Sequence, residues 1–252
     1  MSELPRVEVD GAAYEYEDVP GTGSGAPLLF LHEGLGSVGL WRGFHRRVAE
    51  ATGRRAVAYS RLGHGFSDLP PAKRTIRFAH EEAATVVPAL VEALELADPV
   101  LVGHSDGGSI ALLAAAALPV SGLVVLAPHV IVEEIGLRAI EEAKRAFESG
   151  DLARRMARHH RDAEVCFCNW NDVWLDPAFR DWDLRPELGG ISCPVLGIQG
   201  DADPYGTAVH VGAVQEAVRG TTDLLLCHGG HAPHLERPGL VAATVAGWLR
   251  DR

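Results

Sequence analysis

A serine between glycines is the residue in this sequence best suited to chemistry. Ser105 lies in the stretch GHSDG at 103–107, after a short apolar run that ends at Val102 and before a run rich in alanine and leucine. This order predicts a strand, a sharp turn and a helix, and a G-x-S-x-G turn of this kind lifts the serine hydroxyl above the edge of a sheet. Glycine is expected at 103 and 107 because side chains there would collide where strand and helix approach each other. Ser105 is therefore a candidate nucleophile.

A serine hydroxyl needs a base within hydrogen-bond reach and an acid that holds the base. On a scaffold of this kind the acid and then the histidine follow the serine along the chain. Two later apolar runs end in suitable residues. The stretch GDADP at 200–204 carries Asp201 and Asp203, and HGGHAPH at 228–234 carries histidines at 228, 231 and 234.

The spacing of these three histidines also raises the question of a metal site. Zinc sites need further Cys, His or carboxylate ligands with orienting partners. Pro233 argues against a single helix that would carry all three ligands. We therefore predict no metal and no cofactor, with His228 and His234 as loop or surface residues.

Buried strands and helices must alternate to position these residues. The continuous apolar run 27–31 is typical of a strand buried on both faces of a parallel sheet. Alternating polar and apolar residues at 6–10 and 13–17 predict an antiparallel hairpin. Further strands are predicted at 54–60, 99–102, 122–128, 193–198 and 222–227, and helices at 40–52, 78–96 and 239–249. This alternation predicts a mostly parallel sheet with right-handed crossovers.

The pattern changes after Pro128. An amphipathic helix is predicted at 133–148 and a charged helical stretch near 151–161, followed by an aromatic-rich segment with little periodicity. We interpret residues 130–186 as a small helical cap inserted into a core domain of residues 1–129 and 187–252, at the ends of the strands where open α/β sheets bind ligands. His129, Trp170 and Trp174 are candidates for the wall of a substrate pocket.

Composition excludes several classes of function. The chain has 252 residues, is 47% hydrophobic and carries a net charge of −11, which argues against nucleic-acid binding. The first residues hold no apolar signal segment, and the longest apolar stretch is broken by Pro119 and Gly122, so we predict neither export nor a membrane span. The four cysteines lack C-x-x-C spacing. We expect a cytoplasmic monomer or homodimer whose partner is a small-molecule acyl substrate.

Four motifs, each at the end of a predicted strand, resemble those of the α/β-hydrolase fold family along essentially the whole chain. They are HEG at 32–34, GHSDG at 103–107, Gly200-x-x-Asp203, and Gly230-His231 with Glu236-x-Pro238 behind it. The resemblance implies an α/β fold of about eight mostly parallel strands wrapped by helices. It also implies Ser105 as nucleophile, Asp203 as acid and His231 as base. Asp201 remains the rival acid.

The resemblance further implies an oxyanion hole made of two backbone N–H groups, those of Asp106 and Gly34. Glu33 and Asp106 depart from the residues common in the family, and their carboxylates would oppose a developing negative charge. One hypothesis is that Arg61 or Arg42 neutralises Glu33. The alternative is that an acidic mouth, with Glu33 at the pocket, favours cationic or neutral substrates.

The expected function is serine hydrolysis of a carboxylic ester, lactone or thioester through an acyl-enzyme. Three alternatives remain on the same residues: an acyltransferase or cyclase, a carbon–carbon bond hydrolase, and a non-catalytic ligand-binding protein of the same fold.

Overall fold

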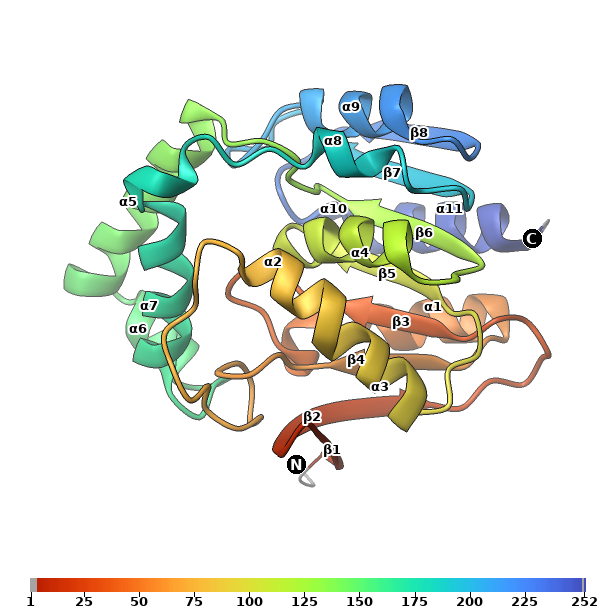
Figure 1. Cartoon of the computed structure of the whole chain (residues 1–252), viewed down its shortest axis with the longest axis horizontal. Coiled ribbons are helices and arrows are strands. Elements are labelled where there is room, and N and C mark those ends of the chain that lie inside the picture. The colour runs from red at the N-terminus through yellow and green to blue at the C-terminus, as the bar shows by residue number, and fades with distance from the viewer. Residues whose placement is uncertain (1–3, 251) are drawn as a thin grey trace.

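One eight-stranded sheet organises the protein (Figure 1). The computed structural model describes residues 4–250 and 252. The strands lie in the order β1-β2-β4-β3-β5-β6-β7-β8, with antiparallel pairing of β1 with β2 and of β2 with β4 and parallel pairing elsewhere, so the predicted α/β class is confirmed. Their bounds are β1 Arg6–Val9, β2 Ala12–Val19, β3 Leu28–Leu31, β4 Ala56–Tyr59, β5 Val100–His104, β6 Gly122–Leu126, β7 Val195–Gly200 and β8 Thr222–Cys227.

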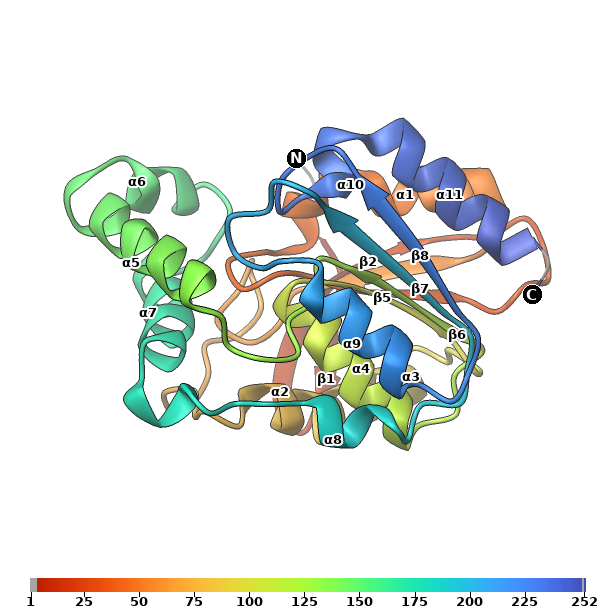
Figure 2. The ribbon, with the colours of Figure 1, turned by 90° about the horizontal axis from the view of Figure 1, so that it is seen from above.

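Helices cover both faces of the sheet (Figure 2). One face carries α1 (Phe44–Thr52), α10 (Pro233–Glu236) and α11 (Pro238–Arg250). The other carries α2 (Phe78–Glu81), α3 (Val87–Ala93), α4 (Asp106–Ala117), α8 (Arg185–Leu188) and α9 (Val209–Ala217). This two-sided cover explains why the central strands are continuously apolar.

Strand β3 shows how one strand serves both layers. Leu28 and Phe30 point into the core beneath α1 and α11, and Leu29 and Leu31 point into the core on the opposite face. All four side chains are fully buried, and burying a side chain of this size stabilises the fold by about 1.5–3 kcal/mol. The strand is thereby fixed in register, because a shift of one residue would exchange the two cores.

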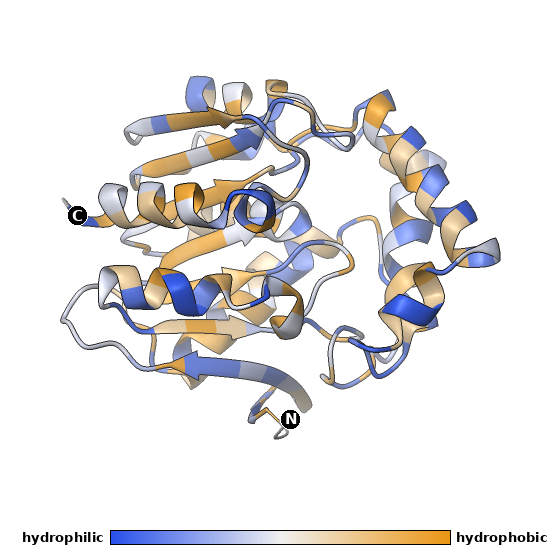
Figure 3. Cartoon of the chain, turned by 180° about the vertical axis from the view of Figure 1, so that it is seen from behind, coloured by the Kyte–Doolittle hydropathy of each residue, from blue (hydrophilic) through white to orange (hydrophobic). Residues whose placement is uncertain are grey.

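Three helices stand apart at the carboxyl ends of the strands (Figure 2). They are α5 (Glu134–Ser149), α6 (Leu152–Met156) and α7 (Ala163–Trp174), followed by a short 3-10 turn, η3 (Pro177–Phe179). Phe147 of α5 stacks on Phe167 of α7 with ring centroids 4.0 Å apart. Hydrophilic and hydrophobic residues alternate along these helices (Figure 3). We refer to the segment from α5 to η3 as the cap helices.

Three helix predictions need correction. The helix predicted at 40–52 is a 3-10 turn, η1 (Val38–Trp41), and a separate α1, because Arg42 and Gly43 adopt φ angles of 49° and 78°. The predicted helix 78–96 contains a π-helical stretch, η2 (Glu82–Val86), just before Pro88, which has no N–H to donate. The aromatic segment without evident periodicity contains helix α7.

Helix α7 was missed although its buried apolar side chains, Phe167, Trp170, Val173 and Trp174, follow the three- and four-residue spacing of one helical face. The buried polar residues Asn169 and Asn171 flank that face and obscure the pattern. Among the described residues, no helix combines the length and apolar character needed to cross a membrane.

Candidate active site

The turn between β5 and α4 presents Ser105. This residue adopts φ 53° and ψ −119°, a strained conformation for a residue with a side chain and one that is concentrated at functional sites. A Cβ atom at Gly103 would collide with the carbonyl oxygen of Gly107, and one at Gly107 would collide with the carbonyl oxygen of Leu31. The prediction that both glycines are needed for the approach of strand and helix is therefore confirmed.

Loops after β7 and β8 bring two further side chains to this serine. His231 Nε2 lies 2.9 Å from Ser105 Oγ, and His231 Nδ1 lies 2.8 Å from Asp203 Oδ2. Because a carboxylate only accepts hydrogen bonds, Nδ1–H is the donor to Asp203. Nε2 is then free to accept the serine proton. The three residues named from sequence motifs thus form one continuous hydrogen-bonded chain.

The carboxylate of Asp203 is buried and fully engaged. Besides His231, it accepts hydrogen bonds from the Tyr205 N–H and from Gln199 Nε2, both at 2.8 Å. Burial raises the pKa of Asp203, but hydrogen bonding to His231, the charge of that ring and the other two donors outweigh burial and lower it. Asp203 is therefore ionised at neutral pH and can stabilise a protonated His231.

The rival carboxylate, Asp201, lies elsewhere. It is exposed, and it accepts a hydrogen bond from the Gly229 N–H at 3.1 Å and lies 3.2 Å from His228 Nδ1. The structure thus separates the two aspartates of one loop: Asp203 faces His231 and Asp201 faces the outside.

The three histidines spaced by three residues diverge. His228 is exposed, as predicted, and His231 faces Ser105. His234 is 1% exposed and packs against Trp41, so its prediction as a loop or surface residue is wrong on burial. In residues 4–250 and 252, no group of three or more His, Cys, Asp or Glu side chains is arranged to hold a metal ion.

Two backbone N–H groups beside Ser105 have no hydrogen-bond acceptor in the described part of the chain: those of Asp106 and Gly34. The turn that carries Gly34 is held by buried side chains. Arg61 donates to the carbonyl oxygens of His32 and Glu33, each at 2.9 Å, and His64 Nε2 lies 2.9 Å from the Gly34 carbonyl oxygen. Donors fixed in this way need no reorganisation when charge develops nearby.

The expected pairing of the Glu33 carboxylate with Arg61 or Arg42 is wrong. Arg61 binds backbone carbonyl oxygens instead, and Arg42 is exposed on the surface. The carboxylate lies 3.5 Å from His104 Nδ1, and His104 Nε2 lies 2.8 Å from the carbonyl oxygen of His231. Burial raises the pKa of Glu33, but the proximity of His104 outweighs burial and lowers it to about 2.

The Asp106 carboxylate faces the cap helices. Its Oδ1 accepts a hydrogen bond from Trp174 Nε1 at 3.1 Å, and the residue is 2% exposed. Burial raises its pKa, and the charges of Arg61 and Arg74 oppose that rise. Trp170 of the same helix lies so close to Gly34 that a Cβ atom there would collide with its indole ring. Both tryptophans therefore bring α7 onto the loops around Ser105.

A cavity of about 110 Å³ opens beside Ser105 and His231. All four pocket candidates named from sequence, Glu33, His129, Trp170 and Trp174, line it. Sequence reasoning missed Leu35, Ile140 and Tyr205, which also line it. The position of Tyr205, two residues after Asp203, was the feature of the sequence that could have predicted its place in the cavity wall.

Comparisons with known proteins identify the family and the fold. A family model described as "Alpha/beta hydrolase family" matches residues 28–244. Serine hydrolase BPHL from Mus musculus is 27% identical over 243 residues, which cover 91% of this chain and 80% of the relative. The dihydrolipoyllysine-residue acetyltransferase component of the acetoin cleaving system from Pseudomonas putida is 33% identical, with coverage of 97% and 69%. The crystal structure of an enol-lactonase from Burkholderia xenovorans LB400 superimposes with a TM-score of 0.75 at 21% identity, covering 98% of this chain and 100% of the other.

Proposed function

Because the chain belongs to the alpha/beta hydrolase family, we propose that it is a serine hydrolase that cleaves a carboxylic ester, lactone or thioester. One observation carries this proposal. The Ser105–His231–Asp203 chain, with distances of 2.9 and 2.8 Å, lies beside two N–H groups that have no acceptor in the described residues.

In the proposed mechanism His231 removes the proton of Ser105 as Oγ attacks the acyl carbon. The Asp106 and Gly34 N–H groups stabilise the negative charge that forms on the carbonyl oxygen. His231 then gives the proton to the leaving oxygen or sulfur, and an acyl-enzyme remains on Ser105. Water attacks that ester with His231 again as base, which releases the acid and restores the serine. Throughout, ionised Asp203 stabilises the imidazolium of His231.

The proposal predicts that a fluorophosphonate probe forms a covalent adduct on Ser105 of the folded protein. The reason is that only a serine with a bound base reacts rapidly with such a phosphorus centre. Intact mass would show one adduct per chain, and peptide mapping would place it. Protein unfolded in urea is the control and should not react. Folded protein that leaves Ser105 unlabelled would rule out the hydrolase proposal.

The cavity also favours one class of acyl group. Its volume of about 110 Å³ lies below the ~150 Å³ that holds a benzene molecule, so short acyl groups fit best without movement of the cap helices. The residues that line it include the acidic Glu33 and Asp106 and the aromatic Trp170, Trp174 and Tyr205. Carboxylates and aromatic faces both attract cations. We therefore propose an acyl group that is neutral or carries an ammonium group.

Chromogenic esters with acyl groups of similar size test this charge preference. We expect an aminoacyl ester to exceed a carboxyl-bearing one by about tenfold or more in kcat/KM, because the latter places two like charges in a confined space. Glu33→Gln and Asp106→Asn should each reduce this ratio, and Glu134→Gln, on the exposed surface of α5, should not change it. Preference for the anionic ester would contradict the proposed charge selectivity and leave the hydrolase proposal intact.

Acyl transfer is the second candidate, because the Pseudomonas putida relative is named as an acetyltransferase component. The two activities differ only in whether water or another nucleophile attacks the acyl-enzyme. Product analysis with an added thiol distinguishes them: a hydrolase yields the free acid as its main product.

A further inference from the structure

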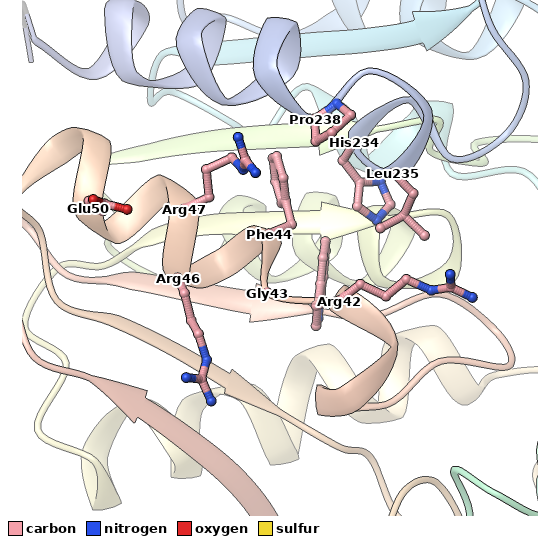
Figure 4. Close-up of a pocket in the computed structure, with 10 residues that line it drawn as sticks. Arg42, Gly43, Phe44, Arg46, Arg47, Glu50, His234, Leu235 and Pro238 are labelled. Carbon is pink, nitrogen blue, oxygen red and sulfur yellow. The ribbon is translucent and has the colours of Figure 1, made fainter.

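Two buried histidines, His129 and His234, have no hydrogen-bond partner for either ring nitrogen within the described residues. The ring of His234 packs 5.0 Å from that of Trp41 and 5.2 Å from that of Phe44. It lies at a surface pocket that Ser105 does not line (Figure 4). Aromatic faces can accept an N–H group, so packing accounts for His234. The ring of His129 instead lines the cavity beside Ser105 and requires another explanation.

The main chain at His129 is held by two helices. Its carbonyl oxygen accepts a hydrogen bond from Ser109 Oγ of α4 at 2.6 Å. The N–H group of the next residue, Val130, donates to His210 Nδ1 of α9 at 3.2 Å. Helix α4 begins directly after Ser105. His129 therefore has a fixed position relative to the candidate nucleophile.

The ring of His129 is oriented by aromatic contacts that use neither nitrogen. It meets the Trp174 ring edge to face with centroids 5.0 Å apart, and it meets the His210 ring with centroids 5.1 Å apart at an interplanar angle of 81°. His129 is 5% exposed, and neither of its ring nitrogens is fully enclosed, in contrast to His234 Nδ1. The accessible part of this ring therefore borders the active-site cavity.

The ring of His129 is also close to the reacting atoms. Its centroid lies 5.6 Å from that of His231, whose Nε2 is 2.9 Å from Ser105 Oγ. The proposed reaction places the scissile carbonyl carbon on that oxygen and the leaving atom beside that nitrogen. A substrate group that contacts His129 is therefore only a few bonds away from the scissile bond.

The His129 ring is neutral at neutral pH. Burial lowers its pKa well below the usual value, and the neighbouring rings of His210 and His231 add to this effect. A neutral imidazole has one N–H donor and one acceptor nitrogen. A hydroxyl group complements either nitrogen because it both donates and accepts, whereas a methyl group complements neither. A carboxylate would accept from the N–H group, but it would meet the acidic Glu33 and Asp106 of the same cavity.

We infer that His129 is a specificity-determining residue that hydrogen-bonds a hydroxyl group of the substrate, a few bonds from the scissile carbonyl. The inference rests on the proposed function for the identity of the ligand as an ester, lactone or thioester. A hydroxyl-bearing acyl group is neutral, so it also meets the charge preference of the cavity. A methyl group in place of the hydroxyl would leave a ring nitrogen unpaired at a buried site, which costs more than lost packing alone.

Two pairs of esters, in each of which a hydroxyl group replaces a methyl group, test this selection. The acyl pair is para-nitrophenyl β-hydroxypropionate and para-nitrophenyl butyrate, and the alcohol pair is hydroxyethyl butyrate and propyl butyrate. We expect the wild-type protein to favour the hydroxyl ester of one pair by about tenfold or more in kcat/KM. The pair in which this preference occurs identifies the part of the substrate that carries the hydroxyl.

Substitutions at position 129 show whether the imidazole is responsible. His129→Phe keeps an aromatic ring against Trp174 and removes both nitrogens, so the preference for the hydroxyl ester should disappear. His129→Asn and His129→Gln place an amide near the positions of Nδ1 and Nε2, and the variant that retains more of the preference identifies the nitrogen. His228→Phe, on the exposed surface, is the matched control and should keep the full preference.

Heteronuclear NMR of the histidine rings in Ser105→Ala protein tests the contact without turnover. The His129 resonances are those that disappear when His129→Gln is added. The hydroxyl ester should shift them saturably and its methyl counterpart should shift them less, because only the hydroxyl bonds to a ring nitrogen.

The two measurements separate this inference from the hydrolase proposal. A selective shift by a hydroxyl ester, together with no hydrolysis of any ester by the wild-type protein, would contradict the hydrolase proposal and support the contact with His129. Absence of a hydroxyl preference in both pairs, an unchanged preference in His129→Phe, or equal shifts for hydroxyl and methyl esters would overturn the inference.

Discussion

Replacing Ser105 with alanine is expected to lower kcat for a short chromogenic ester by roughly 10⁴- to 10⁶-fold. The substitution removes the Oγ atom that lies 2.9 Å from His231 Nε2 and leaves the two N–H donors and the cavity in place. KM should change little, because the variant keeps the same cavity lining around the acyl group. Steady-state kinetics on purified protein gives both constants.

The melting temperature, Tm, is the control that shows whether this variant is folded. Alanine at 105 keeps a Cβ atom at φ 53°, so the strain of the turn is retained and Tm should move little. Ser149→Ala, at the exposed end of α5, is a matched serine substitution and should retain full activity. A Ser105→Ala enzyme with more than a tenth of wild-type kcat would show that another nucleophile acts.

Asp203→Asn is expected to lower kcat by roughly 10⁴-fold, whereas Asp201→Asn should stay within about threefold of wild type. An amide at 203 can donate to His231 Nδ1, which favours the tautomer whose Nε2 carries a proton and cannot accept one from Ser105. It also removes the negative charge that stabilises the imidazolium. Asp201 instead contacts His228 and Gly229 at the surface, so its charge is screened by solvent.

A comparison of Asp203→Asn with Asp201→Asn decides which aspartate is the acid. The two residues lie in the same loop and differ by two positions, so both substitutions introduce the same chemical change into nearly the same chain segment. Equal losses would indicate damage to the loop rather than loss of the acid. A large loss in Asp201→Asn alone would transfer the role of acid to that residue.

Sequence predicted best where local chemistry alone determines the structure. The buried strands, the hairpin at Asp10-Gly11 and the turn at Ser105 follow from runs of apolar residues and from glycines with one possible role. Helix α7 was missed because buried polar residues, Asn169 and Asn171, flank its apolar face. Burial of polar side chains depends on tertiary contacts that the sequence does not reveal.

The sequence predicted the three residues of the hydrogen-bonded chain, but not the side chains that hold the surrounding loops in place. Motif order placed Ser105, Asp203 and His231 at three strand ends, and the structure brings them together. The pairing of Glu33 with His104 and the binding of carbonyl oxygens by Arg61 depend on side-chain directions that no spacing in the sequence reveals. The positions of Arg61 and Arg42 at neighbouring strand and helix ends suggested an arginine partner for Glu33, but Arg61 donates to backbone carbonyl oxygens instead.

The hydrogen bond from Trp174 to Asp106 has a consequence for how such a protein can diversify. It joins Asp106, which follows Ser105 in the turn, to Trp174 of α7, 68 positions later in the chain, so a change in the cap helices alters the surroundings of that turn. If recombination replaced the cap helices with those of a relative that lacks an indole at 174, the buried carboxylate of Asp106 would lose this hydrogen bond. Substitution at position 106 or 174 is therefore constrained by the residue at the other position, and we expect the two residues to change together.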